Sequence, residues 1–284
     1  MKIAKKIEDR ITASIPKFQA ILKRASALDL NESDTVTIIG DMLAEMFGYD
    51  KYSEVTSELA IRGTYCDLAI KIKDKWEYLI ECKAVGCELK EAHMRQAINY
   101  GANKGIQWVI LTNGIEWQLY RLRFEQPISW DLVLKLNMNE GSPKDQRFID
   151  SIYLLCKEGI DKSAREDLHE KIQCVNRFMI GTILMSPPVV SIVRRELRQL
   201  ADGVTVLDEE VLKIIKDGCL RRDLIDGEEA EAARKKYAKT QTREKRPPAK
   251  KTDTPSDAPA PTAPSAPQEP STTDSQPVDP VSEN

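Results

Sequence analysis

The sequence predicts an α/β (α+β) protein in which helices flank a mixed sheet, followed by a small helical region and a disordered tail. Short apolar segments with strand-like alternation cluster in the first half of the chain, interrupted by one helical pattern. Beyond Pro143 the apolar residues recur at helical spacing. Ten of the 15 prolines lie in residues 247–284, a composition that buries too little apolar surface to fold. We therefore expect a helical lead-in at 1–27, the sheet domain at 28–138, the helical region at 145–236 and the tail at 237–284.

Composition excludes several classes of protein. The formal net charge is -3, and residues 1–130 carry equal numbers of basic and acidic side chains, so nucleic acid would have to be bound by a local patch and a metal ion. The six cysteines form no C-x-x-C and there are only two histidines, which argues against structural zinc. Cys82 and Cys87 are expected as small core residues. Without a signal peptide or a long apolar run, we expect a cytoplasmic protein that does not enter a membrane.

Two helices are expected before the first strand. Residues 3–27 carry apolar side chains at helical spacing, and Pro16 is expected to divide this stretch into two pieces. Asn31 or Ser33 can cap the next helix, which ends at Gly48. This second helix has two carboxylates of interest, Glu32 at its start and Glu45 near its end. An acid at the start also suits the helix dipole, and one near the end also suits a solvated face.

The sheet domain is organised around a predicted hairpin within residues 65–84, after a first strand at 53–61 and a turn at Gly63. Its second strand, Trp76–Lys83, is rich in apolar and aromatic residues, as suits a central strand, and ends in Glu81-Cys82-Lys83. Side chains two residues apart on a strand share a face, so Glu81 and Lys83 point the same way. Burying this carboxylate and ammonium would cost free energy, which a functional role or a charged partner would explain.

The turn of the hairpin decides where Asp67 lies. A three-residue loop, Lys73-Asp74-Lys75, would place Asp67 directly opposite Glu81, with Cβ atoms about 5 Å apart. A two-residue loop would pair Asp67 with Cys82 and put the two carboxylates on opposite faces. Two opposed carboxylates repel each other unless a cation lies between them, and Mg²⁺ suits a site of two carboxylates, waters and phosphate oxygens.

A helix at 88–104 and two further strands are expected after the hairpin. Gln96 and Tyr100 lie four residues apart and so share a face of the helix. Asn113-Gly114 marks a hairpin turn between strands at 108–111 and 115–122, and an edge strand is expected at 128–137. On the returning strand Trp117 is expected in the core, whereas Arg121 and Arg123 lie at its end, where they could meet phosphate.

The hairpin residues resemble a known signature. Asp67 followed by Glu81-x-Lys83 resembles that of the PD-(D/E)xK nucleases. The Gln96-x-x-x-Tyr100 spacing, the run at 108–120 and N-E-S-D-T from Asn31 are similar to the N-terminal nuclease domain of type I restriction enzyme R subunits. The resemblance covers about residues 28–135, and Cys66 stands where that family usually has proline. It implies a restriction-endonuclease-like fold and a Mg²⁺-dependent DNA endonuclease of restriction or defence type, with Mn²⁺ as a possible substitute.

The resemblance also implies roles for individual residues. Asp67, Glu81 and the carbonyl of Cys82 would hold the metal, and Glu32 would help to bind metal or water. Lys83 would position the attacking water. Gln96 would hold the lysine or the substrate, and Tyr100 would contact nucleic acid.

Two alternatives to a DNA endonuclease remain open. A binding or assembly protein could keep the nuclease fold without cutting, and metal chemistry at a phosphodiester does not itself choose DNA over RNA. The sequence contains no P-loop, so we expect that the protein either works alone or obtains DNA targeting or motor function from a protein partner.

The region 145–236 reads as a series of helices without a base-reading signature. We expect helices at 168–185 and 189–200, and one capped by Asp208 that runs to about Leu220. A scaffold or dimerisation unit explains this region better than DNA recognition does, so a homodimer is an expected assembly.

Overall fold

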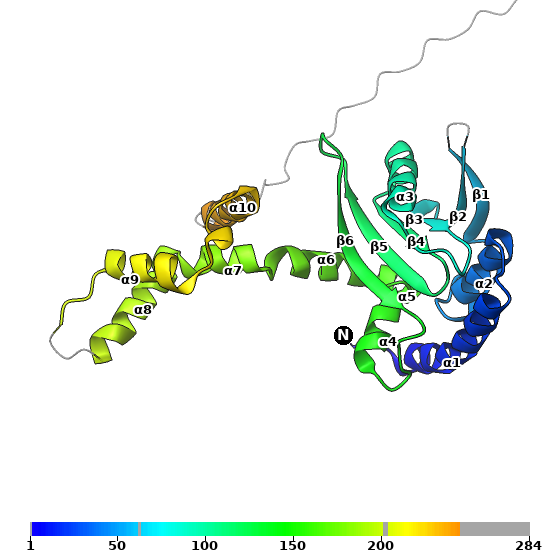
Figure 1. Ribbon diagram of the computed structural model, residues 1–284, viewed down its shortest axis with the longest axis horizontal. Coiled ribbons are helices and arrows are strands. Elements are labelled where there is room, and N and C mark those ends of the chain that lie inside the picture. Colours follow the sequence, from blue (N-terminus) through cyan, green and yellow to red (C-terminus); the bar gives the residue numbers. More distant parts are fainter. Residues whose placement is uncertain (1, 62–63, 201–203, 245–284) are drawn as a thin grey trace, which may run out of the picture. The chain divides into compact units, whose positions relative to one another are not determined.

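A computed structural model describes residues 2–61, 64–200 and 204–244 (Figure 1). Its contacts divide the chain into one unit of residues 1–238 and a second of residues 239–284. The expected turn at Gly63, the basic run from Lys245 and the Pro-rich tail lie outside the described residues.

One six-stranded mixed sheet forms the centre of the first unit and confirms the predicted fold class. Its strands lie in chain order, and every neighbouring pair is antiparallel except β3 and β4, which are parallel and joined through helix α3. The elements are β1 Val55–Ile61, β2 Thr64–Ile72, β3 Lys75–Cys82, α3 Glu91–Lys104, β4 Trp108–Thr112, β5 Glu116–Arg123 and β6 Ser129–Asn137.

Helices cover both faces of the sheet (Figure 1). On one face, α1 (Lys5–Ala27), α2 (Glu32–Glu45) and α4 (Gln146–Tyr153) pack onto alternate strand residues. On the other face α3 packs onto the remaining set, in which Ala97 and Ile98 meet Leu79 of β3. Because Glu81 follows Leu79 by two positions, it shares the face that α3 covers.

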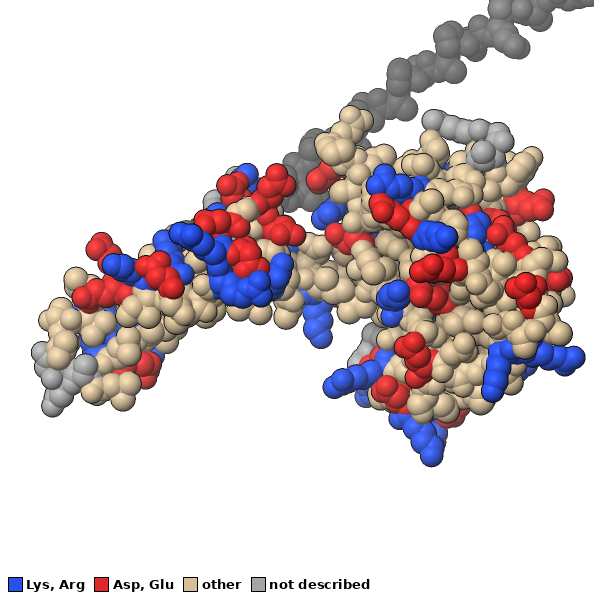
Figure 2. Space-filling view, in the orientation of Figure 1, with Lys and Arg blue, Asp and Glu red and all other residues tan. Residues whose placement is uncertain are grey.

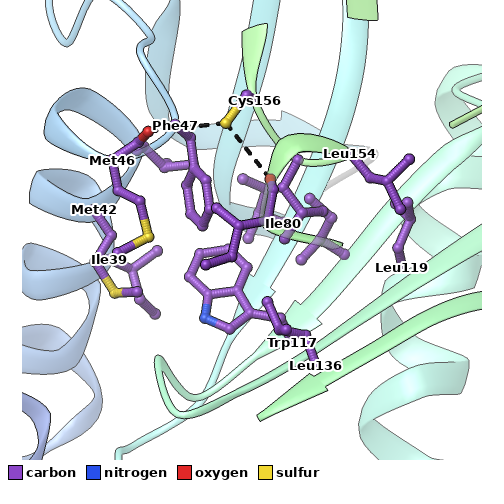
Figure 3. Packing of buried hydrophobic residues seen from close by; sticks show 14 of the residues in the cluster. Ile39, Met42, Met46, Phe47, Ile80, Trp117, Leu119, Leu136, Leu154 and Cys156 are labelled. Carbon is purple, nitrogen blue, oxygen red and sulfur yellow. Dashed lines mark hydrogen bonds between the residues drawn. The ribbon is translucent and has the colours of Figure 1, made fainter. Parts of the chain in front are cut away.

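The core beneath α1 and α2 is densely aromatic and sulfur-rich (Figure 3). Trp117 is 1% exposed and meets the edge of Phe47 with 4.9 Å between ring centroids. Its indole N–H donates to the Gly114 carbonyl at 2.8 Å, so burial leaves no polar atom unpaired on this ring. The prediction that Trp117 belongs to the core is therefore confirmed.

The expected break at Pro16 is wrong, because α1 is one helix of 23 residues with Pro16 inside it. The residues on its buried stripe, Ile11, Ile15, Phe18 and Leu22, lie on both sides of the proline and anchor to a single core. Packing of this stripe outweighs the hydrogen bond that proline removes, which costs about 3 kcal/mol in a free helix.

Beyond the sheet the chain is helical, as expected, but one expected helix is divided, and the helix expected at 189–200 already begins at Pro187. The expected helix at 168–185 is two helices, because the Asn176 side chain accepts from the Met179 N–H and starts a new one. The elements are α5 Lys157–Asp161, α6 Ala164–Cys174, α7 Arg177–Leu184, α8 Pro187–Leu200, α9 Asp208–Ile214, the π-helical turn η1 Ile215–Cys219, the 3₁₀ turn η2 Arg222–Leu224 and α10 Glu228–Glu244. Leu207, not Asp208, is the residue that precedes α9.

Candidate functional site

The turn between β2 and β3 differs from the expected three-residue loop. Ile72 pairs with Lys75, which leaves only Lys73 and Asp74 in the loop. Both have left-handed backbone angles, φ 48° and 65°, as a two-residue hairpin turn that follows the twist of the strands requires. The expectation of a three-residue loop is therefore wrong.

A β-bulge nevertheless brings Asp67 to Glu81. Ile70 pairs with Tyr78 while Lys71 pairs with Trp76, so Glu77 is one extra residue on β3. The pairing then continues to Leu68 and Ile80, and the next step along the ladder sets Asp67 against Glu81. The sequence argument that a two-residue loop would separate the two carboxylates fails because the bulge supplies the missing residue.

Arg165 holds the bulged residue in place. This arginine of α6 is only 2% exposed, and its guanidinium pairs with the Glu77 carboxylate and donates to the Glu77 carbonyl at 3.3 Å. The same guanidinium lies 4.5 Å from the centroid of Tyr78 and 4.9 Å from that of Trp108. The helical region is thus fixed to the strand that carries the candidate site.

Glu81 and Lys83 form a largely buried ion pair where β3 ends. Glu81 is 1% exposed, and its Oε1 lies 2.8 Å from the Lys83 Nζ. The second oxygen, Oε2, is buried without a hydrogen-bond partner. A buried carboxylate oxygen in this state is costly, and functional sites are where such costs persist. On the neighbouring strand Asp67 accepts the Cys82 backbone N–H at 2.7 Å.

Burial and mutual repulsion set the protonation of these groups. Burial, with repulsion from Asp67, raises the pKa of Glu81 to about 7 although Lys83 opposes the shift. Burial also raises the pKa of Asp67, against the Cys82 N–H and Lys83. For Lys83 burial would lower the pKa, but Glu81, Glu32 and Asp67 outweigh it and raise the pKa. The site therefore keeps its ammonium, while the pKa of Glu81 lies near neutral pH.

Of the two helix carboxylates, Glu32 lies at the site. Its Oε2 is 3.5 Å from the Lys83 Nζ. Asn31 caps α2 by accepting the Asp34 N–H, and the Thr35 hydroxyl accepts the Val85 N–H at 3.1 Å, so the start of α2 is tied to the loop after β3. Glu45 instead forms an exposed ion pair with Lys17.

Sequence reasoning missed a further carboxylate, Glu58 of β1. Ser57 pairs with Leu68 and Leu59 with Cys66, so Glu58 lies across from Asp67. Its charge adds to the burial that raises the pKa of Asp67. Glu58 has a left-handed backbone, φ 52°, which interrupts the ladder at this step. The spacing of residues in the β1–β2 hairpin is the sequence signal that indicates this pairing of Glu58 with Asp67.

The α3 residues lie on the same side of the sheet as Glu81, but their hydrogen bond is to each other. Gln96 Nε2 donates to Tyr100 Oη at 3.0 Å, and Tyr100 packs partly buried against the core beneath α3. Lys83 is paired with Glu81 and Glu32 instead. The geometry thus gives Gln96 and Tyr100 a mutual contact rather than a contact with the lysine.

Arg121 and Arg123 lie at the other end of the sheet from Lys83. Thr112, which pairs with Cys82, faces Trp117 at the start of β5, whereas Arg121 pairs with Trp108 at the start of β4. Arg121 stacks 4.8 Å from the Trp108 centroid. Arg123 donates to Ser129 and Asp131. The structure does not bring these two arginines to the carboxylates.

The donors present fit Mg²⁺ as the cation. Within the described part of the chain, no group of three or more His, Cys, Asp or Glu side chains is arranged to hold a metal ion. Mg²⁺ needs fewer protein ligands, since one or two carboxylates, waters and substrate phosphate complete its shell. Asp67 and the unpaired oxygen of Glu81 supply such ligands. Of the two nearby cysteines that were expected in the core, Cys82 is buried there, whereas the expectation for Cys87 is wrong because this residue is only half-buried.

Across residues 2–61, 64–200 and 204–244, each helix taken alone is too short or too polar to cross a membrane, although the bent pair α7 and α8 would pass together on length and composition.

One comparison with known protein families bears on the sheet domain. Searches of curated proteins and of solved structures gave no match. A family model does match about a third of the chain, and the matched part holds Asp67, Glu81, Lys83, Gln96 and Tyr100. Residues 39–128 are similar to the family described as type I restriction enzyme R protein N terminus (HSDR_N).

Proposed function

We propose that the protein is a Mg²⁺-dependent DNA endonuclease of the PD-(D/E)xK type, with Asp67, Glu81 and Lys83 at its centre. The observation that carries the proposal is the buried Glu81–Lys83 pair with one carboxylate oxygen left unpaired, set beside Asp67. The matched family makes restriction-type cleavage of DNA the first reaction to test.

Some residues of the chain would bind the metal ion, and others would stabilise charge on the phosphoryl group. Mg²⁺ bound by Asp67, Glu81 and the Cys82 carbonyl would polarise a phosphoryl oxygen and lower the pKa of a water molecule. Lys83 keeps its proton, so its ammonium can stabilise charge that develops on the phosphoryl oxygens. The Glu32 carboxylate, 3.5 Å from the Lys83 Nζ, would help to orient the ammonium. Cleavage on this pattern leaves a 5′-phosphate.

Gln96 and Tyr100 are proposed to contact the substrate rather than the metal. They project from α3, which covers the face of the sheet that holds Glu81. In the free protein they hydrogen-bond to each other, and a bound strand would exchange that contact for its own.

The assembly partners follow from the same domain. DNA is the proposed substrate, and a second protein is proposed to supply targeting or motor function, as the subunits of restriction enzymes are divided. All six cysteines are free, which agrees with a reducing cytoplasm.

The test is cleavage of supercoiled plasmid by the full chain with Mg²⁺ or Mn²⁺, beside an EDTA control. Lys83→Ala is expected to lose nicking at least about 100-fold, because removing one charge-stabilising group costs that much in comparable sites. Lys51→Ala, which removes an exposed ion pair with Asp41, is the matched control and should nick normally. A parallel assay with RNA of the same sequence tests whether the protein cleaves DNA, RNA or both.

Two results would count against the proposal. Nicking that Lys83→Ala retains would assign it to a contaminant or to another site. Absence of both nicking and calorimetric Mg²⁺ binding in the wild-type chain would favour a binding or assembly protein that keeps the fold.

A further inference from the structure

Residues 83–87, which we name the lysine loop, follow the end of β3 and have no regular secondary structure apart from a turn. Hydrogen bonds nevertheless tie the backbone of this loop to two neighbouring elements. The Lys83 N–H donates to the Thr112 carbonyl of β4 at 2.8 Å, which continues the pairing of β3 with β4. The Val85 N–H donates to the Thr35 hydroxyl of α2 at 3.1 Å. This second bond depends on one side chain, so a single substitution can remove it.

Thr35 is suited to hold the lysine loop because it is itself fixed on its helix. It is 0% exposed, and its hydroxyl donates to the Asn31 carbonyl at 2.8 Å while it accepts the Val85 N–H. Glu32 lies three residues before Thr35 on α2, so the same turn of helix carries the carboxylate that lies 3.5 Å from the Lys83 Nζ. The Thr35 hydroxyl thus sets the helix of Glu32 against the loop of Lys83.

Asn113 holds the far end of the lysine loop. Its side-chain N–H donates to the Cys87 carbonyl at 2.9 Å. Its side-chain oxygen accepts the N–H groups of Ile115 and Glu116, at 3.0 and 2.7 Å. The residue is 8% exposed, so these bonds are shielded from water. Asn113 therefore joins the loop to the turn between β4 and β5, as Thr35 joins it to α2.

The distribution of charge on the sheet domain makes the place of each ammonium important. Figure 2 shows described acidic and basic side chains mixed over the face of the sheet domain that it displays, rather than gathered into a broad basic area. Charge mixed in this way gives this face little general attraction for a phosphate strand. Stabilisation of a reacting phosphoryl group would therefore depend on individual ammonium groups such as that of Lys83.

We propose that Thr35 and Asn113 are positioning residues for the cleavage reaction, and that they act by fixing the lysine loop. The inference rests on the proposed function, in which the Lys83 ammonium stabilises charge on the phosphoryl group. That ammonium lies 2.8 Å from Glu81 Oε1 on a side chain that is 12% exposed. Its place is set by the backbone that carries it as well as by its ion pairs. Electrostatic stabilisation works through groups that are already in place when charge develops, so a loosened loop would slow cleavage.

The test of Thr35 compares two substitutions that remove different atoms. Thr35→Val keeps the shape of the side chain and loses the hydroxyl, whereas Thr35→Ser keeps the hydroxyl and loses the methyl group. Both change a fully buried residue, so both should lower the Tm. Only Thr35→Val should slow single-turnover nicking of plasmid in saturating Mg²⁺, by at least about tenfold, since a small misplacement of a reacting group has effects of this size.

The matched control is Thr37→Val, which removes the same hydroxyl from an exposed residue of α2. The Thr37 hydroxyl donates to the Ser33 carbonyl of its own helix at 3.3 Å, so the variant should nick normally. Calorimetric Mg²⁺ binding should not fall in Thr35→Val, because Asp67 and Glu81 lie on paired strands rather than on the loop. General damage to the fold would instead lower Mg²⁺ binding and nicking together.

Asn113→Asp applies the same test at the other end of the loop. The variant keeps the oxygen that accepts the two N–H groups of the turn and loses the N–H that the Cys87 carbonyl accepts. It should slow nicking by about tenfold as well. Nicking at the wild-type rate would remove Asn113 from the proposal.

Acylation of lysine amines by acetic anhydride tests the position of Lys83 without any cleavage. Mass spectrometry reads the extent of labelling at each lysine, and Lys51, whose side chain is 45% exposed, serves as the internal reference. Lys83 should label slowly in the wild type and at least about fivefold faster in Thr35→Val, because the loop opens more often without its bond. Thr35→Ser and Thr37→Val should label like the wild type.

The outcomes keep this proposal apart from the proposed function. A Thr35→Val variant that nicks and labels like the wild type overturns the positioning role. Equal slowing of nicking in Thr35→Ser also overturns it, because the loss would then follow stability rather than the hydroxyl. A wild-type chain that nicks nothing contradicts the nuclease, and the labelling of Lys83 then decides by itself whether Thr35 holds the loop.

Discussion

The sheet domain and the helical region differ in which side chains depart from the usual pattern of burial. In β4 every residue is buried, and what is unusual there and on β3 is polar: Glu77 and Glu81 lie inside the protein. In α8 a single residue is buried, and what is unusual is apolar: Ile192 and its neighbours lie outside. Buried charge in a well-packed domain indicates chemistry, whereas exposed apolar surface on a thinly packed one indicates a partner. The two regions therefore call for different experiments.

The largest effect is expected at the buried charge of the sheet domain. Glu81→Gln removes one proposed metal ligand without changing size, so plasmid cleavage should fall by at least about 10³-fold, or ~4 kcal/mol. Urea unfolding should show no loss of stability, because the variant removes a buried charge. Glu45→Gln, at the exposed carboxylate paired with Lys17, is the control. Cleavage by Glu81→Gln at the wild-type rate would remove the carboxylate from the mechanism.

Truncating an apolar side chain should change the free energy of unfolding very differently in the two regions. Trp117→Ala deletes a fully buried indole and is expected to cost about 4 kcal/mol of the free energy of unfolding. Ile192→Ala, at a half-exposed side chain of α8, should cost no more than about 0.5 kcal/mol in the monomer. Urea denaturation of each variant at low protein concentration measures both. Equal losses of unfolding free energy would show that the Ile192 side chain is buried within one chain.

The link between the regions is the next test. Arg165→Met leaves the buried Glu77 carboxylate paired with the largely exposed Lys75 ammonium but without its buried partner, and should destabilise the protein by about 3 kcal/mol. Adding Glu77→Gln to that variant removes the poorly compensated charge, so the double variant should recover most of the loss. Thermal unfolding of the two single variants and the double variant completes the cycle. Additive losses would mean that the two side chains do not depend on each other.

The sequence predicted the strands and their succession along the chain because those depend on local patterns. Alternation identified the strands, and the spacing of Glu81 and Lys83 placed both on one face without any tertiary information. The register of Asp67 could not be derived, because it depends on a bulge at Glu77 that Arg165 holds from 88 residues away. Nothing in the local sequence indicates such a contact.

Other misses have the same origin in packing at long range. Pro16 is tolerated because one core holds the helix on both sides of it. Arg121 lies far from Lys83 because β4 and β5 are antiparallel, so the end of one strand meets the start of the other. Glu32 was distinguished from Glu45 only when the fold placed one against Lys83 and the other against Lys17.

The smallest effect, and the one that sharpens the comparison most, is the pH dependence of the sheet domain. Burial raises the pKa of Glu81 to about 7 from 4.5, so between these values the folded chain keeps a proton that the unfolded chain has lost. The contribution of Glu81 to stability is therefore complete below pH 4.5 and declines as the pH rises to 7, by about 3 kcal/mol in total. Asp67, whose pKa is also raised by burial, changes stability in the same direction.

The quantity to measure is the difference in unfolding free energy between wild type and Glu81→Gln, in EDTA, at pH 5 and pH 8. Other carboxylates cancel in that difference, so the wild type should lose stability relative to the variant as pH rises. Mg²⁺ should offset the loss at pH 8, since a cation that binds the ionised carboxylates stabilises only the folded chain. A wild type that gains on the variant at pH 8 without metal would mean that Lys83 neutralises Glu81 fully, and that the unpaired oxygen is not poised for a cation.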